Sequence, residues 1–253
     1  MGNYKFIQNS IIDDRDVITM SKRLIIAIDG PSGVGKSGSA RLLAERLGYI
    51  CMDTGAFYRA AAWKVLKENI TPDEEELKRI SEIINIRFDL QTFNHLIDNG
   101  CNEQNRLRIF VDNCDITEEL RREDIGRMAS IVSASPYIRK RLLPIQRDAG
   151  KDGGIVVEGR DIGTEVFPEA DVKFYLDALP GVRGRRRWRE LKSRDIDIDL
   201  DTIIEDINKR DEKDSKRECA PLKTPEDAIV IDTTDISLVE VVDRMEKEIR
   251  KRV

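Results

Sequence analysis

The chain has little of several features that mark particular classes of protein. Its 253 residues include one histidine, His95, and its four cysteines lack the paired short spacing of a zinc site or a disulfide framework. No stretch approaches the roughly 18 apolar residues that a membrane-spanning helix needs. The net charge of -5 at pH 7 gives no overall attraction to nucleic acid. We therefore expect a cytoplasmic protein with reduced thiols and with neither a membrane nor a nucleic-acid partner.

The N-terminal segment 1–21 precedes the first stretch that resembles a core strand. It lacks a basic start followed by an unbroken apolar core, so we do not interpret it as a secretory signal. It is either a flexible arm or an upstream extension of a chain that starts at Met20, and the sequence leaves both open. The length of the whole chain suits one domain with inserts.

A glycine-rich loop at 30–37 is the strongest motif in what is present. It reads GPSGVGKS, follows an apolar run at 24–29 and leads into a segment with helical apolar spacing. Its glycines let backbone N–H groups line an anion site at a helix N-terminus. Lys36 would reach the outer phosphates of a nucleoside triphosphate, and the Ser37 hydroxyl would bind Mg²⁺. The predicted ATP-binding residues are Gly30, Pro31, Ser32, Gly33, Val34, Gly35, Lys36 and Ser37. The alternative is a chance glycine turn before a helix.

Strand and helix patterns alternate along most of the chain. Apolar runs bounded by turn residues predict strands at 24–29, 49–52, 153–159, 171–177 and 228–232, with helical segments between them. This order predicts an α/β fold of the P-loop NTPase type, with a five-stranded parallel sheet flanked by helices. Short alternating segments at 86–90 and 107–111, separated by Asn99-Gly100, predict a small antiparallel insert, and 117–146 is helical in pattern with an interruption at Pro136.

Two basic regions lie near the predicted carboxyl-terminal strands. The first contains Arg183, Arg185, Arg186, Arg187 and Arg189. The second is a predicted helix on which Arg210, Asp214 and Arg217 share one face. Such a face can grip a phosphorylated sugar, but it can equally be an ordinary solvated, salt-bridged surface. The arginine cluster likewise has the alternative of a solvated or nucleic-acid-binding patch.

Several motifs together resemble the bacterial cytidylate kinases, which belong to the nucleoside-monophosphate kinase group of P-loop proteins. These motifs are GPSGVGKS at 30–37, DTGAFYR at 53–59, DITEELR at 115–121, EGRDIGT at 158–164 and NKRDEKDSKRECAPL at 208–222. The resemblance covers about 23–245. Two positions depart from the family pattern: Thr54 stands where serine is familiar, and Gly38 stands where a second hydroxyl residue often follows Ser37.

The resemblance implies both an organisation and a set of roles. It implies an N-terminal arm at 1–21, core segments at 22–56, 128–180 and 200–253, a monophosphate-binding domain with the small sheet at 57–127, and an Arg-rich lid at 181–199. Arg59, Arg160 and Arg217 would hold the acceptor phosphate, Tyr58, Arg210 and Asp214 would face the sugar, and Thr54, Ser130, Arg139 and Asp161 would face or frame the cytosine. Arg183, Arg186 and Arg187 would belong to the lid, and with Lys36 and Arg160 we interpret them as catalytic.

The chemistry of the implied reaction fits this composition. A monophosphate acceptor is already mostly dianionic at neutral pH, so no catalytic base is needed, and the scarcity of histidine is no objection. We expect a monomeric kinase that transfers the γ-phosphoryl of ATP, with Mg²⁺, to CMP or dCMP. A carboxylate such as Asp161 can accept from the amino group of cytosine but not from the carbonyl of uracil, so UMP should be a poor substrate. The alternatives are a P-loop kinase for another small acceptor and a non-catalytic nucleotide- or RNA-binding regulator.

Overall fold

The computed structural model describes residues 23–89 and 108–252. The predicted arm at 1–21, His95 and the Asn99-Gly100 turn lie outside the described residues. Among the described residues, no helix has both the length and the apolar character needed to cross a membrane. The cytoplasmic location stays a prediction.

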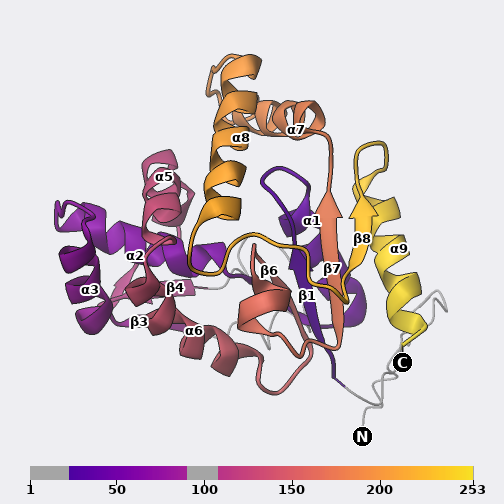
Figure 1. The fold of residues 1–253 in the computed structure, drawn as a ribbon, viewed down its shortest axis with the longest axis horizontal. Helices are drawn as coiled ribbons and strands as arrows, with labels where there is room; N and C mark the ends of the chain where they lie inside the picture. Colours follow the sequence, from indigo (N-terminus) through magenta and orange to yellow (C-terminus); the bar gives the residue numbers. More distant parts are fainter. Residues whose placement is uncertain (1–22, 90–107, 253) are drawn as a thin grey trace, which may run out of the picture.

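A parallel five-stranded sheet forms the centre of the molecule (Figure 1). Its strands are β1 (Ile25–Asp29), β2 (Ile50–Asp53), β6 (Ile155–Glu158), β7 (Val172–Asp177) and β8 (Ile229–Asp232). Their order is β2-β6-β1-β7-β8, and every neighbouring pair is parallel. The predicted α/β class and five-stranded parallel sheet are therefore confirmed, with each strand within a few residues of its predicted position. Because all strands run the same way, their carboxyl ends share one edge, where ligands of such sheets bind.

Helices lie on both sides of this sheet. They are α1 (Lys36–Leu47) and α9 (Leu238–Arg250) on one side, and α2 (Gly55–Lys67) and α6 (Pro136–Gly150) on the other. Helices α3 (Glu74–Ile83) and α5 (Glu123–Val132) pack against α6 and α2. Along β1, Ala27 belongs to the core with α2, α5 and α6, while Ile26 and Ile28 belong to the core with α1 and α9. This alternation follows from the two-residue period of a strand, and the unbroken apolar run of β1 reflects burial on both faces.

A small antiparallel sheet lies beside α2. It consists of β3 (Ile86–Asp89), β4 (Arg108–Val111) and β5 (Cys114–Asp115). The sequence predicted the first two strands but not β5, which is too short to show alternation. The predicted helical stretch from 117 to 146 is three elements: η1 (Glu119–Arg121), α5 and α6, with Pro136 at the first position of α6. A proline fits there because the first helical N–H needs no partner within the helix.

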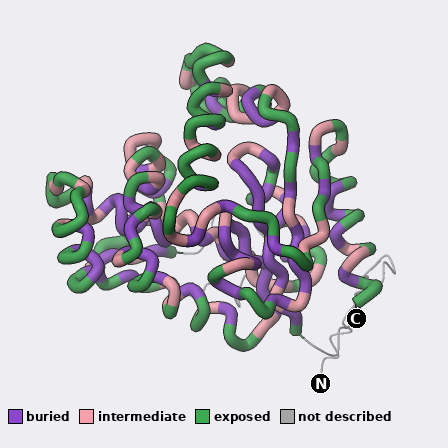
Figure 2. The backbone as a smooth tube through the Cα atoms, viewed as in Figure 1, coloured by how far each residue is buried: buried purple, intermediate pink, exposed green. Residues whose placement is uncertain are grey.

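Two helices, α7 (Pro180–Lys192) and α8 (Leu200–Lys216), project from the carboxyl edge of the sheet (Figure 1). Figure 2 shows that the central strands are mostly buried, whereas α8 is largely exposed and α7 has buried, intermediate and exposed residues. They have a small core of their own, formed by Leu191, Ile203 and Ile207. The first half of α8 therefore packs with the predicted lid at 181–199. Arg217 follows the end of α8 with an extended backbone, so it is not on the helix as the sequence suggested.

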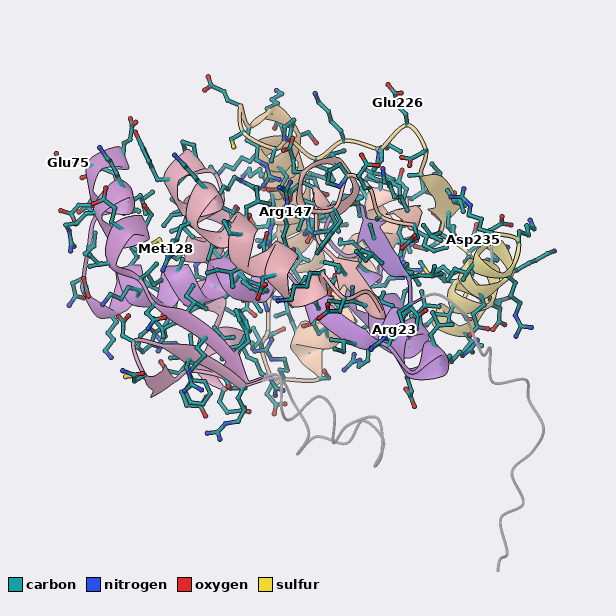
Figure 3. The ribbon with its side chains drawn as sticks, turned by 90° about the horizontal axis from the view of Figure 1, so that it is seen from below. Arg23, Glu75, Met128, Arg147, Glu226 and Asp235 are labelled. Carbon is teal, nitrogen blue, oxygen red and sulfur yellow. The ribbon has the colours of Figure 1, made fainter. Side chains whose placement is uncertain are left out.

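A short π-helix, η2 (Ile162–Val166), follows the Gly159-Arg160-Asp161 segment after β6. Both oxygens of the Asp29 carboxylate accept from its first amides, those of Ile162 at 2.8 Å and Gly163 at 2.7 Å. On the opposite side, Arg147 of α6, labelled in Figure 3, donates to the backbone oxygens of Glu165 and Val166. The end of β1 and helix α6 thus fix the turn that carries Arg160 and Asp161. Burial nevertheless raises the pKa of Asp29 to about 6.

Candidate active site

The predicted phosphate-binding loop connects β1 to α1 at the carboxyl edge of the sheet. Gly30 has φ +144°, and a Cβ atom placed on it would lie 2.1 Å from the backbone oxygen of Leu176 in β7. Only glycine fits at this point, because the loop passes directly over the neighbouring strand. Lys36 lies at the start of α1 and its Nζ donates to the oxygen of Pro31 at 2.6 Å. The loop therefore wraps around the amino group of its own lysine.

Lys36 lies near carboxylates to which the sequence assigned no role. Glu158, at the end of β6, accepts a hydrogen bond from the Ser37 hydroxyl and lies near both Lys36 and Asp53. Burial, with the Asp53 charge, raises the pKa of Glu158, and burial, with the Arg160 charge, lowers the pKa of Lys36. The sequence contains a signal for Glu158, namely an acidic residue at the carboxyl end of a buried strand. In a parallel sheet that position lies at the same edge as the loop lysine.

Three arginines from different elements form the second half of the site. Arg160 follows β6, Arg59 is on α2 and Arg210 is on α8. Burial together with the positive charges of Arg160 and Arg59, partly offset by Asp214, lowers the pKa of Arg210. Its buried Nε has no hydrogen-bond partner among the described residues. Arg59 is partly exposed, and its ion pair with Asp53 is long at 4.0 Å. Cations gathered in this way are suited to an anionic group.

Asp161 lies in a buried ionic network. Its carboxylate accepts from Arg139 at 2.7 Å and lies 3.4 Å from Arg217, and these three side chains are only 6 to 8% exposed. Arg217 also lies 3.7 Å from Asp214, which in turn pairs with Arg160 at 3.2 Å. The network thus links Asp161 through Arg217 and Asp214 to Arg160.

The remaining predicted base-framing residues lie around this network. The Arg139 guanidinium lies 5.1 Å from the centre of the Tyr58 ring, and burial raises the pKa of that phenol to about 12. Thr54 is buried and its hydroxyl donates to the backbone oxygen of Glu158 at 2.9 Å. Ser130 is half-buried on α5. The structure therefore places Arg217 with the base-framing residues and places Arg210 with Arg59 and Arg160.

The three predicted lid arginines have different surroundings. Arg183 is 6% exposed and contacts Ser32 and Asp211. Arg186 donates to Thr233 and reaches the oxygen of Val34 at 3.4 Å, next to the phosphate-binding loop. Arg187 pairs with Glu190 on its own helix and with Glu123 of α5 at 2.9 Å. Arg186 and Arg187 are half-buried, but only Arg186 contacts the phosphate-binding loop through its guanidinium without an acidic partner among the described residues, whereas Arg183 is paired with Asp211.

A separate hollow of about 560 Å³ is lined by residues of the predicted lid at 181–199 and by Leu200. Trp188, Arg185 and Arg189 contribute to its lining, together with the start of α8. None of its lining residues belongs to the phosphate-binding loop or to the arginine cluster of Arg59, Arg160 and Arg210. The hollow therefore does not coincide with the predicted binding residues.

The chain is similar to known proteins over most of its length. The family model described as Cytidylate kinase matches residues 26–251. A cytidylate kinase of Geobacter sulfurreducens is 44% identical over 230 residues, covering 90% of this chain and 94% of that protein. A cytidylate kinase of Bacillus subtilis is 38% identical over 233 residues, covering 92% and 99%. A solved shikimate kinase from Bacteroides thetaiotaomicron has a TM-score of 0.41 at 13% identity, covering 90% of this chain and 99% of its own.

Proposed function

The chain belongs to the cytidylate kinase family and is a phosphotransferase acting on CMP, and we propose the residues by which it transfers the γ-phosphoryl of ATP to CMP or dCMP. The observation that carries this proposal is that the loop with Lys36 follows β1 and Arg160 follows the neighbouring parallel strand β6, so both lie at the same carboxyl edge of the sheet. The Arg160 charge also contributes to the lowered pKa of Lys36. A donor phosphate on one and an acceptor phosphate on the other would meet between them.

The loop at 30–37 would hold the donor. Its inward N–H groups and the Lys36 ammonium would bind the outer phosphates, and Arg186, beside the loop, would add positive charge from the lid. Arg187 would contact the donor phosphates after its ion pair with Glu123 breaks. We propose a lid that comprises 181–199 and the first half of α8, because these segments share one small core.

Arg59, Arg160 and Arg210 would bind the acceptor phosphate. The unpartnered Nε of Arg210 supports this role, because a buried donor without a partner is costly and a phosphate oxygen would satisfy it. The monophosphate needs no base, so these residues would orient it for in-line attack and offset the repulsion between two anions. The resemblance assigned Arg217 to the phosphate and Arg210 to the sugar; we propose instead that Arg210 binds the phosphate and that Arg217 frames the base.

The base and sugar would lie on the Asp161 network. Asp161 would accept from the cytosine amino group, framed by Arg139, Arg217 and the Tyr58 ring. Asp214 would accept from sugar hydroxyls, which favours CMP over dCMP by a modest factor. Thr54 and Ser130 would complete the frame of the base. Since all these residues come from one chain, a monomer would be sufficient for activity.

A magnesium ion would fit beside Ser37. Oxygen ligands are what Mg²⁺ prefers, and the Ser37 hydroxyl and the Glu158 carboxylate are in hydrogen-bond contact. Among residues 23–89 and 108–252, no group of three or more His, Cys, Asp or Glu side chains could hold a metal by itself. This agrees with an ion shared with substrate phosphates. When bound, the ion would neutralise charge on the donor phosphates.

Formation of ADP with CMP, dCMP and UMP, compared side by side, tests the proposal. We expect turnover with CMP and dCMP, a much lower kcat/KM with UMP, and loss of turnover by about 10²-fold or more in Lys36→Ala with the fold retained. Circular dichroism checks the fold. A near-normal rate for Lys36→Ala, or a hydroxylated metabolite preferred over every monophosphate, would contradict it. No described contact favours a different acceptor or a non-catalytic regulator.

A further inference from the structure

One buried ion pair links the phosphate-binding loop to α8. The Asp211 carboxylate accepts from the Ser32 N–H at 2.8 Å and pairs with Arg183. Arg183 in turn donates to the backbone oxygens of Ser32 at 2.9 Å and Ala178 at 3.0 Å. Both backbone hydrogen-bonding groups of Ser32 are therefore held by side chains. The exposed fractions of the Arg183 and Asp211 side chains are 7% and 13%, so solvent screens this pair weakly.

The loop also packs against the first turns of α7 with almost no space between them. Gly33 has φ +78°, and a Cβ atom on it would lie 3.0 Å from the Cβ of Arg183 and 3.1 Å from its backbone oxygen. A side chain at Gly33 would therefore push the loop away from Arg183. Because the guanidinium of Arg183 is occupied by Asp211 and by backbone oxygens, it acts on the loop rather than on a ligand.

Asp211 lies between residues that the proposed function assigns to the acceptor. Arg210 precedes it, and Asp214, one turn later on α8, pairs with Arg160. A helix is stiff over one turn, so fixing Arg210 and Asp214 fixes Asp211 as well. Helix α8 therefore contacts the donor loop and the proposed acceptor site within five consecutive positions, 210–214.

We propose that Asp211 and Arg183 are positioning residues that hold the phosphate-binding loop in register with the acceptor site, so that CMP bound at α8 strengthens binding of the donor nucleotide. This inference rests on the proposed function, because it needs the acceptor at Arg210 and Asp214. When CMP orders α8, the donor nucleotide loses less conformational entropy on binding, so it binds more tightly. The coupling is reciprocal, so the donor strengthens CMP binding by the same factor. Arg183 then contributes to phosphoryl transfer through the loop and not as a lid charge.

Calorimetric titration of ADP with and without saturating CMP tests the coupling, because ADP has no γ-phosphoryl and does not react. In the wild type, CMP is expected to lower the Kd of ADP by about fivefold or more. In Asp211→Asn the side chain still accepts from the Ser32 N–H but no longer neutralises Arg183. We expect a higher Kd for ADP and an unchanged Kd for CMP alone. The ratio of the ADP Kd without CMP to the ADP Kd with CMP should be close to one. Glu212→Gln is the matched control, because this neighbouring carboxylate is exposed and pairs with Lys216; both Kd values and the coupling should stay normal.

A second variant guards against a folding defect in the first. Arg183→Lys keeps the charge opposite Asp211 but loses the planar fork that reaches Ser32 and Ala178, so the coupling should fall in the same direction. Wild-type coupling in either folded variant overturns the proposal, as does an equal loss of ADP and CMP affinity. Absence of a CMP effect in a wild type that forms ADP from ATP and CMP overturns this inference alone. A wild type without CMP-dependent ADP formation refutes the proposed function instead.

Discussion

Replacing Asp161 by asparagine separates the structural and the recognition roles of this residue. Asp161 lies between Arg139 at 2.7 Å and Arg217 at 3.4 Å, and all three side chains are at most 8% exposed. The substitution retains one acceptor oxygen but removes the only negative charge of the three. Burial and the neighbouring Arg139 already lower the pKa of Arg217. Two buried cations would then face each other with less compensation.

The stability cost follows from this geometry. Removing one partner of a buried ion pair costs about 3–5 kcal/mol, and Asp161→Asn should lie near 3 kcal/mol because asparagine still accepts from Arg139. At about 2–4 °C per kcal/mol for a chain of this size, Tm should fall by about 6–12 °C. CMP at saturation should restore part of this loss.

The effect on base choice is separate. A buried hydrogen bond that uracil leaves unmade costs about 1–3 kcal/mol, which corresponds to a preference of about 5- to 150-fold for CMP over UMP. Asparagine offers both a donor and an acceptor to the base, so most of that preference should disappear in Asp161→Asn. The ratio of kcat/KM values for CMP and UMP measures it directly.

Asp214→Asn is the matched control for this prediction. Asp214 is equally buried and also pairs with two arginines, Arg160 and Arg217. Its replacement should lower Tm similarly and raise the KM for CMP, but it should leave the CMP-to-UMP ratio unchanged because it faces the sugar. An unchanged ratio in Asp161→Asn, or an equal loss in both variants, would refute the assignment of Asp161 to the base.

Two further predictions concern the phosphate-binding loop. Gly30→Ala should destabilise the protein by about 3 kcal/mol or more and abolish ADP binding, because the new Cβ overlaps the oxygen of Leu176 and φ is +144°. Gly126→Ala is the control, because Gly126 lies in a helix and no neighbouring atom among the described residues is within 4 Å of the added Cβ. Its free energy of unfolding in urea should rise by about 0.5–1 kcal/mol. Equal stabilities of the two variants would contradict this interpretation of the loop. Burial lowers the pKa of Lys36 to about 7, so its amine is mostly neutral at pH 8 in the free protein. Because a bound phosphate should raise this pKa again, ADP binding without Mg²⁺ should take up protons near pH 8 and weaken as the pH rises further. Calorimetry in buffers of different ionisation enthalpy should show this uptake in the wild type but not in Lys36→Arg, and equal uptake in both would exclude Lys36 as its source.

Local patterns were sufficient for the frame of this molecule. The five strands, the loop at 30–37 and the two long strands of the small sheet could be predicted because each depends on periodicity and turn residues within one segment. The sequence predictions were wrong where a strand is very short and where the end of a helix depends on tertiary contacts. The strand Cys114–Asp115 is too short to show a pattern, and α8 ends before Arg217 although the charge spacing continues.

The sequence by itself determined that a glycine-rich phosphate-binding loop follows a buried strand, and it provided many arginines and a single histidine. Only the tertiary structure decided how those charges are shared. It placed Arg183 under the loop with Asp211, placed Arg210 and Arg217 in different parts of the site, and placed Glu158 beside Ser37. The physical reason is distance along the chain. Loop and strand formation depend on neighbouring residues, whereas the partner of a buried charge comes from a distant element, as in the contact of Ser32 with Asp211, 179 positions away.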